Sequence, residues 1–232
     1  MPSILEDPST RNPPPKAHTI AAPTLSPRKT TLPKLSNAPI TLYPITGGAK
    51  TVPKELVKFL HEEFTAEIIR GATYPMEQPM ALDQFAEYWF GTFAVLAILD
   101  DEGEGLREGR DWERVCLGTF YIKPNYPGRC SHICNAGFLT TTAARGKGVG
   151  QAMGEAYLEF APRLVWLSLP TLALAAGYTY SVFNLVFANN PASIRIWENL
   201  GFSVIGRVPK AARLANSEEL VDALIFGREL GN

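Results

Sequence analysis

A glycine-rich junction between an apolar segment and a helix constrains the fold of this sequence more than any other feature. Residues 132–139 form an apolar run, which is followed by Arg145-Gly146-Lys147-Gly148-Val149-Gly150 and then by a helical pattern from Gln151. Glycines at such a junction let backbone N–H groups converge without obstruction by Cβ atoms, and the helix N-terminus adds a partial positive charge. The pattern predicts a strand–loop–helix unit that binds a pyrophosphate.

The same junction has a simpler interpretation, a tight turn that only starts a helix. Its spacing, Arg-x-x-Gly-x-Gly, differs from the Walker pattern and from the dinucleotide-binding pattern Gly-x-Gly-x-x-Gly. A second unit of matching character lies about forty residues further on: a strand over 180–188, the turn Asn189-Asn190-Pro191, a helix over 192–200 and the pair Gly201-Phe202. Two such units favour a binding site over an isolated turn.

Hydrophobic patterns place the other elements. Strands are predicted over residues 40–45, 92–99, 115–123, 132–139, 178–188 and 221–228. Helices are predicted over 53–71, over 82–90, after Arg145 and over 192–200. This order predicts an α/β or α+β sandwich around one mixed sheet.

Composition divides the chain into a tail and one domain. Residues 1–37 are rich in Pro, Ser, Thr and Lys without hydrophobic periodicity, so they are expected to form a disordered tail, and residues 38–232 a single domain. The first forty residues carry five Lys or Arg against Glu6 and Asp7, which is also a property of organelle-targeting leaders. Nine prolines in the same stretch oppose the amphipathic helix of such a leader.

Overall composition excludes several classes of function. The formal net charge of −1 provides no basic field for a nucleic acid or an anionic membrane. No apolar stretch reaches the roughly 18 residues of a membrane span. The three cysteines, Cys116, Cys130 and Cys134, form neither a zinc pattern nor a disulfide framework, so no metal is expected and free thiols in a reducing compartment are predicted.

The two units together resemble the GNAT acetyltransferase superfamily. Arg145-x-x-Gly148-x-Gly150 is similar to its acyl-CoA pyrophosphate loop, and residues 190–202 are similar to its Asn-x-x-Ser/Ala…Leu-Gly-Phe segment. Three longer strings resemble the yeast enzymes that acetylate the ring nitrogen of proline analogues such as azetidine-2-carboxylate: Leu117-Gly-Thr-Phe-Tyr-Ile-Lys-Pro-Asn-Tyr126, Arg129-Cys-Ser-His132 with Cys134-Asn-Ala-Gly-Phe-Leu139, and Phe183-Asn-Leu-Val-Phe187. The resemblance covers about residues 39–230.

This resemblance implies a mostly antiparallel sheet of about seven strands with helices on both faces and acetyl-CoA as co-substrate. The pantetheine arm would enter between two diverging strands, with the thioester near Phe138 and Leu139 and the Phe138 N–H as oxyanion donor. The implied cofactor-binding residues are Phe138, Leu139, Thr140, Arg145, Gly146, Lys147, Gly148, Val149, Gly150 and Asn190.

The resemblance also implies how a small amine binds. Asn135 would hold this substrate, the backbone of Asn184 and Leu185 would receive its carboxylate, and the Asn190 amide would stabilise the departing CoA thiolate as a catalytic group. On structural grounds alone, Asn135 would satisfy a strand bulge and Asn190 would cap the following helix.

Other acceptors remain open, namely a polyamine, an amino sugar or a protein lysine, and so does a non-catalytic acyl-CoA-binding module. Related enzymes imply a homodimer in the cytosol or in mitochondria, with roles in detoxifying proline analogues and tolerating oxidative stress.

The sequence departs from the family pattern in two places. Trp197 stands where many GNAT enzymes have a tyrosine that protonates the thiolate, and an indole N–H is not an effective acid. No general base is evident, and the candidates are Glu67, His132 or a chain of waters. The second departure is an insertion over about residues 163–175, expected at the end of a helix that is remote from the site.

Overall fold

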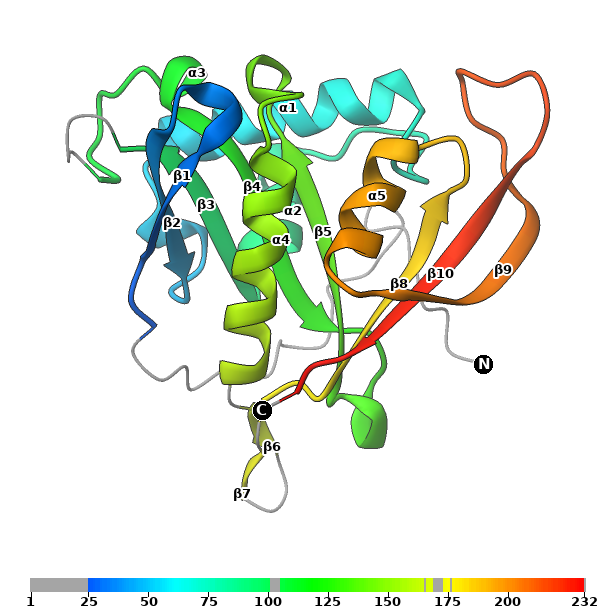
Figure 1. The fold of residues 1–232 in the computed structure, drawn as a ribbon. Helices are drawn as coiled ribbons and strands as arrows, with labels where there is room; N and C mark the ends of the chain where they lie inside the picture. Colours follow the sequence, from blue (N-terminus) through cyan, green and yellow to red (C-terminus); the bar gives the residue numbers. More distant parts are fainter. Residues whose placement is uncertain (1–24, 101–104, 165, 169–172, 176, 232) are drawn as a thin grey trace.

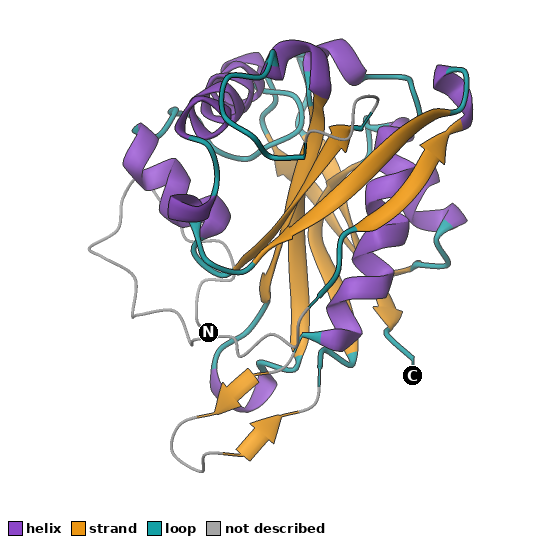
Figure 2. Ribbon diagram, turned by 90° about the vertical axis from the view of Figure 1, so that its left-hand side faces the viewer, coloured by secondary structure: helices purple, strands orange, loops and turns teal. Residues whose placement is uncertain are grey.

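The computed structural model describes residues 25–100, 105–164, 166–168, 173–175 and 177–231. One sheet of eight strands in the order β1-β2-β3-β4-β5-β8-β10-β9 forms the centre of the fold, and only the β5–β8 pairing is parallel. Helices α1, α2 and α3 cover one face of the sheet, while α4 and α5 cover the other (Figures 1 and 2). The expected mixed, mostly antiparallel sheet with helices on both faces is confirmed.

The strands of the sheet are β1 (Arg28–Leu32), β2 (Ala38–Ile45), β3 (Phe93–Leu99), β4 (Cys116–Pro124), β5 (Ile133–Thr140), β8 (Tyr180–Phe187), β9 (Ser203–Ala212) and β10 (Val221–Glu229). The helices are α1 (Lys54–Arg70), α2 (Leu82–Phe90), α3 (Trp112–Val115), α4 (Val149–Phe160) and α5 (Pro191–Asn199). Short 3₁₀ turns η2 (Pro33–Leu35) and η5 (Thr142–Ala144) lie between these elements.

Strand β3 is apolar throughout because both of its faces are covered. Phe93, Val95 and Ala97 pack in the core beneath α4, whereas Ala94, Leu96 and Ile98 pack in the core beneath α1 and α2. Side chains alternate between the two faces of a strand, so a continuous apolar run is what a doubly covered strand requires.

Helix α1 begins and ends at the proline and the glycine that the sequence analysis used as its bounds. Pro53 is its N-cap, and Gly71 ends it in the left-handed region at φ 61°. Its apolar stripe, which includes Leu60, Phe64 and Ile68, is buried in the core. Burial of a side chain such as Phe64 contributes about 1.5–3 kcal/mol, which anchors the helix to the sheet.

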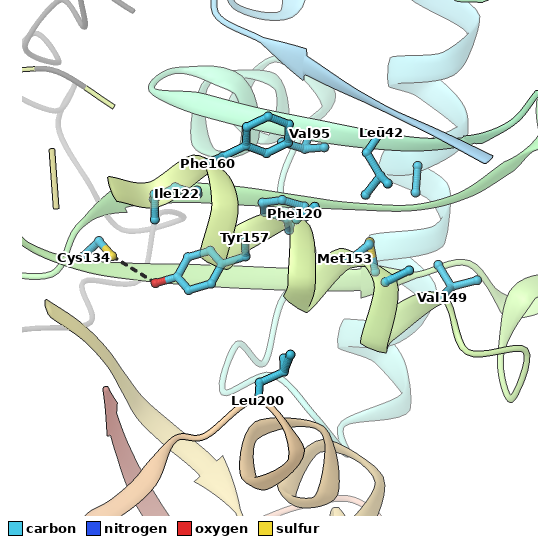
Figure 3. Close-up of a cluster of buried hydrophobic side chains, with 14 of the residues drawn as sticks. Leu42, Val95, Phe120, Ile122, Cys134, Val149, Met153, Tyr157, Phe160 and Leu200 are labelled. Carbon is cyan, nitrogen blue, oxygen red and sulfur yellow. Dashed lines mark hydrogen bonds between the residues drawn. The ribbon is translucent and has the colours of Figure 1, made fainter. Parts of the chain in front are cut away.

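Strands β5 and β8 pair at only two positions, Ile133↔Tyr180 and Cys134↔Ser181, and then diverge. The closed end is tied by Tyr157 of α4, whose hydroxyl lies 2.9 Å from the Cys134 sulfur (Figure 3). The same hydroxyl lies 2.5 Å from the Ser181 hydroxyl. Beyond this point the two strands leave an opening in the middle of the sheet, as expected for the pantetheine arm.

Two strands of the eight-stranded sheet were missed by the sequence prediction, and the tail boundary was wrong. Residues 28–32 form the edge strand β1, which pairs with β2 from Arg28↔Leu42 to Leu32↔Ala38, so the ordered domain begins before residue 38. Residues 1–24 lie outside the described residues. The other missed strand, β9, forms the opposite edge of the sheet.

The insertion contains two short paired strands, β6 (Trp166–Ser168) and β7 (Ala173–Ala175); the rest of it, apart from Arg163 and Leu164, lies outside the described residues. These strands follow the C-terminal end of α4, at the opposite end of that helix from residues 145–150, the glycine loop (Figure 1).

The cysteine environments predict distinct reactivities. Burial raises the pKa of the Cys116 and Cys134 thiols to about 12, whereas Cys130 is exposed. Since the thiolate is the reactive form, one thiol is expected to react promptly with a disulfide reagent at pH 8, and three after denaturation. Rapid modification of all three in the native protein would contradict the buried positions.

Candidate active site

A groove of about 1970 Å³ occupies the opening between β5 and β8 and reaches both faces of the sheet. On one side it is lined by the glycine loop and helix α5, and on the other by α2 and the loop after α1. The predicted site residues that line it are Asn135, Phe138, Leu139, Thr140, Arg145, Gly146, Gly148, Val149, Gly150, Asn184, Leu185 and Asn190.

The glycine loop forms the turn that the sequence predicts. Gly148 is the N-cap of α4 and has φ 87°, a conformation that residues with a Cβ rarely adopt. The first N–H groups of α4 have no carbonyl one turn earlier within the helix, so they are available to an anionic ligand in the groove.

Lys147 is the exception among the predicted cofactor residues. It does not line the groove, and its backbone N–H donates to the Ala144 carbonyl at 3.4 Å. The Lys147 amide is therefore engaged within the loop.

Helix α1 holds the segment that precedes the glycine loop through two carboxylates one turn apart. Glu63 accepts hydrogen bonds from the backbone N–H and the hydroxyl of Thr142, at 2.7 and 3.0 Å. Glu67, which is buried, pairs with the guanidinium of Arg145 and accepts from Arg70 at 2.7 Å and from the Thr73 hydroxyl at 2.5 Å. Sequence reasoning missed the contacts with Thr142 and Arg145 because they join residues nearly eighty positions apart.

These contacts change the interpretation of two predicted residues. The guanidinium of Arg145 is bound to Glu67 of α1, so this side chain attaches the loop to that helix. Glu67 was a candidate general base, but both of its carboxylate oxygens accept hydrogen bonds from protein donors. These contacts attach the loop to helix α1 through Glu67.

The backbone of Phe138 faces the opening. The Thr141 N–H donates to the Leu117 carbonyl at 3.1 Å, so residues 117 and 141 form a hydrogen-bonded pair. Hydrogen-bonded and non-hydrogen-bonded pairs alternate along an antiparallel ladder, so Phe138 and its partner Phe120 form a non-hydrogen-bonded pair. The N–H and C=O of Phe138 therefore point away from β4.

Tyr74 reaches this same edge from the loop after α1. Its hydroxyl donates to the Phe138 carbonyl at 2.9 Å. Burial raises the pKa of Tyr74 well above its ordinary value, and the nearby Tyr88 and Glu67 raise it further. The Tyr74 hydroxyl therefore stays protonated and acts as a donor at neutral pH. No sequence pattern indicates this contact.

Three asparagine amides form a cluster at the other end of the groove. Asn125, which is buried, and Asn184, which is half-buried, exchange two amide hydrogen bonds, at 3.2 and 2.6 Å, and the Asn135 amide donates to Asn125 at 3.0 Å. Asn135 and Asn184 were predicted as substrate-binding residues, and the structure brings them together through Asn125. Sequence analysis did not include Asn125 among the predicted site residues.

Asn190 and Trp197 both contact Ser193 in α5. The Asn190 side-chain oxygen accepts from the Ser193 N–H at 3.1 Å, so Asn190 caps α5 while it lines the groove. The Trp197 indole N–H donates to the Ser193 hydroxyl at 2.9 Å, and its ring packs on Phe183 and Phe138 at centroid distances of 4.3 and 4.9 Å. Trp197 therefore builds the wall of the groove and supplies no acid.

The second candidate base, His132, is exposed and lies outside the groove lining, and its carbonyl accepts from the Thr179 N–H at 3.1 Å. This agrees with a structural role at the start of β5. Neither protein side chain nominated as a general base is therefore placed to serve as one.

No group of His, Cys, Asp or Glu side chains that could hold a metal ion occurs in the described part of the chain. Among the same residues, no helix is long and apolar enough to cross a membrane.

Comparison with known proteins agrees with this fold, although no protein-family model matches the chain. The N-acetyltransferase aca1 of Schizosaccharomyces pombe is 41% identical over 178 residues, which cover 75% of this chain and 79% of that protein. The protein SPT10 of Saccharomyces cerevisiae is 28% identical over 82% of this chain but only 33% of its own length.

Solved structures share the fold. A GCN5-related N-acetyltransferase from Kribbella flavida matches with a TM-score of 0.63 and 24% identity, over 81% of this chain and 97% of its own. A phosphinothricin acetyltransferase from Sinorhizobium meliloti, solved with acetyl-CoA, matches with a TM-score of 0.59 and 17% identity, over 83% of this chain and 89% of its own. The chain belongs to the GNAT superfamily of N-acetyltransferases.

The contacts of Glu67 predict the effect of its removal. Glu67→Gln weakens the tie to Arg145, so the KM for acetyl-CoA is expected to rise several-fold and the free energy of unfolding to fall by about 1–2 kcal/mol. Steady-state kinetics and denaturant unfolding measure the two effects. The control is Glu62→Gln on the same helix, since Glu62 is exposed and pairs only loosely with Lys58 at 3.8 Å. Equal behaviour of the two variants would exclude the positioning role.

Proposed function

We propose that this protein transfers the acetyl group of acetyl-CoA to the amine of a cyclic imino acid, a proline analogue such as azetidine-2-carboxylate, in a ternary complex. The observation that carries the proposal is the opening between β5 and β8, which joins a glycine loop on one face of the sheet to an asparagine cluster on the other. In the reaction a C–N bond forms, the C–S bond of the thioester breaks, CoA leaves as a thiolate and the amine loses a proton.

The cofactor end of the groove suits acetyl-CoA. The amides of the glycine loop and the start of α4 would bind the pyrophosphate, and the diverging strands would admit the pantetheine arm. The Phe138 N–H faces the opening, so it can donate to the thioester oxygen as negative charge develops there. Structural neighbours that are solved with acetyl-CoA support this assignment of the cofactor.

The acceptor end suits a small polar molecule. Asn135 donates its amide to Asn125, which leaves its oxygen to accept from the substrate amine. Asn184 is fixed by its two bonds to Asn125, so the backbone of Asn184 and Leu185 would receive a carboxylate at a defined place. The acceptor would lose its proton to water, because Glu67 is engaged and His132 lies outside the groove.

Another amine is the alternative acceptor. The acidic segment over residues 100–113 would favour a polyamine or a lysine tail, but residues 101–104 of it lie outside the described residues. Tight binding of CoA without turnover on any amine would instead identify a non-catalytic binding module.

A homodimer stays a prediction. Exposed apolar side chains on the edge strand β9, namely Val204, Ile205 and Val208, support an association there.

The first test is turnover. Purified protein with acetyl-CoA and azetidine-2-carboxylate is expected to lose thioester absorbance and release one equivalent of CoA for each acetylated imino acid. Spermidine, glucosamine and a lysine peptide serve as comparison acceptors. Preferred turnover of one of these, or no turnover of any imino acid, would reject the substrate claim.

Asn190 variants separate capping from catalysis. Asn190→Asp keeps an acceptor for the Ser193 N–H but removes the amide donor, so kcat is expected to fall about 100-fold with stability nearly unchanged. Asn190→Ala should show a similar loss of kcat and also lose about 1 kcal/mol of stability.

The matched control is Asp111→Ala, which removes the cap of α3, where Asp111 accepts from the Arg114 N–H at 3.2 Å. It should affect stability alone, because α3 is not part of the groove. Wild-type kcat in Asn190→Asp would show that Asn190 is only a cap.

A further inference from the structure

Lys123 of β4 lies in the acceptor end of the groove. Its ammonium nitrogen is 4.3 Å from the ring centroid of Tyr88 and 4.6 Å from that of Tyr121. The two tyrosine hydroxyls are 2.9 Å apart and bonded to each other. Contact with two aromatic faces holds the cation at a defined place by cation–π attraction.

The register of the sheet puts this lysine beside Asn135, whose side-chain amide is predicted to bind the substrate. Lys123 is directly opposite Asn135 in the β4–β5 ladder, and Tyr121 is opposite Gly137. Directly opposite residues project to the same face of a sheet, so Lys123 and Asn135 share one wall. A Cβ at Gly137 would lie 2.5 Å from the Tyr121 ring, so a glycine there allows the ring to lie flat against β5.

The distribution of charge along the groove separates Lys123 from the other cations. Among the described residues that line the groove, Lys34 lies beside Gly148, Arg145 is paired with Glu67, and Arg195 belongs to α5, so these three are at the cofactor end. Asp83 and Glu87 of α2 lie on the exposed rim of the acceptor end. A cation on the wall and carboxylates on the rim fit a molecule that carries both signs of charge.

We propose that the Lys123 ammonium binds the carboxylate of the acceptor and thereby selects amino and imino acids over simple amines and polyamines. The inference rests on the proposed acetyltransferase function and adds a side-chain contact to the backbone groups of Asn184 and Leu185. A polyamine brings positive charge to the same wall and is repelled.

The neighbouring tyrosines support this role at neutral pH. Burial raises the pKa of Tyr88 to about 12, partly offset by its hydrogen bond to Tyr121, and burial raises the pKa of Tyr121 as well. Both hydroxyls therefore stay neutral. No phenolate competes with a substrate carboxylate for the lysine, and the rings keep the neutral form that attracts a cation.

The test uses a pair of acceptors that differ only by the carboxylate, azetidine-2-carboxylate and azetidine. Lys123→Met is expected to lower kcat/KM about 10- to 100-fold for the acid, mainly through KM, and to leave azetidine unchanged. Lys123→Arg should retain the preference for the acid. Lys58→Met, at a lysine whose side chain is 70% exposed on α1, is the matched control and should leave both acceptors unchanged.

Equal losses on both acceptors in Lys123→Met would overturn the proposal, as would a wild-type enzyme that prefers azetidine. Calorimetric titration of azetidine-2-carboxylate into the protein–CoA complex gives the same comparison without turnover. If the protein binds azetidine-2-carboxylate without turnover and Lys123→Met weakens that binding, the proposed function is rejected and the lysine contact is kept. If the protein does not bind the acid, or if Lys123→Met leaves the binding unchanged, the lysine contact is rejected.

Discussion

The separation of β5 from β8 after two paired residues is the constraint on which the site depends. A continuous sheet would use every backbone group of β5 for its neighbours, whereas here the N–H and C=O of Phe138 face the groove. The opening needs a fixed closed end, and the buried contacts among Cys134, Tyr157 and Ser181 provide it. Packing on both faces then holds the two strands apart, with Phe138, Phe183 and Trp197 forming an aromatic wall between the sheet and α5.

The two faces of the sheet carry different parts of the groove lining. The α4–α5 face carries the glycine loop and the apolar wall, and the α1–α2 face carries the tyrosines, Lys123 and the asparagine cluster. Helix α1 connects the two, because Glu63 and Glu67 bind the segment before the loop while Thr73 and Tyr74 follow the helix toward Phe138. A substitution in α1 can therefore affect cofactor binding without any contact with the cofactor.

The sequence was sufficient for elements that carry local signals. Pro53 and Gly71 mark the bounds of α1, and the glycines around 148 mark the start of α4. Strands β1 and β9 were missed because each is an edge strand with few buried side chains, and Gly206 and Pro209 within β9 oppose a strand on local criteria. The predicted site residues gather in one groove, with the exception of Lys147. Their partners Tyr74 and Asn125 were not assigned to the site, and Glu67 was considered only as a general base, because each joins the site through a side-chain contact that only the folded chain creates.

Strand β1 has a practical consequence for anyone shortening this protein. Its five residues cover the outer edge of β2, and the turn that follows places Lys34 next to the glycine loop. A version cut at the compositional boundary near residue 37 would present β2 as a bare strand edge, with a row of unpaired peptide groups ready to pair with another molecule. Such a truncation would invite self-association and would remove part of the groove wall, although the deleted stretch reads as dispensable from its amino acids alone.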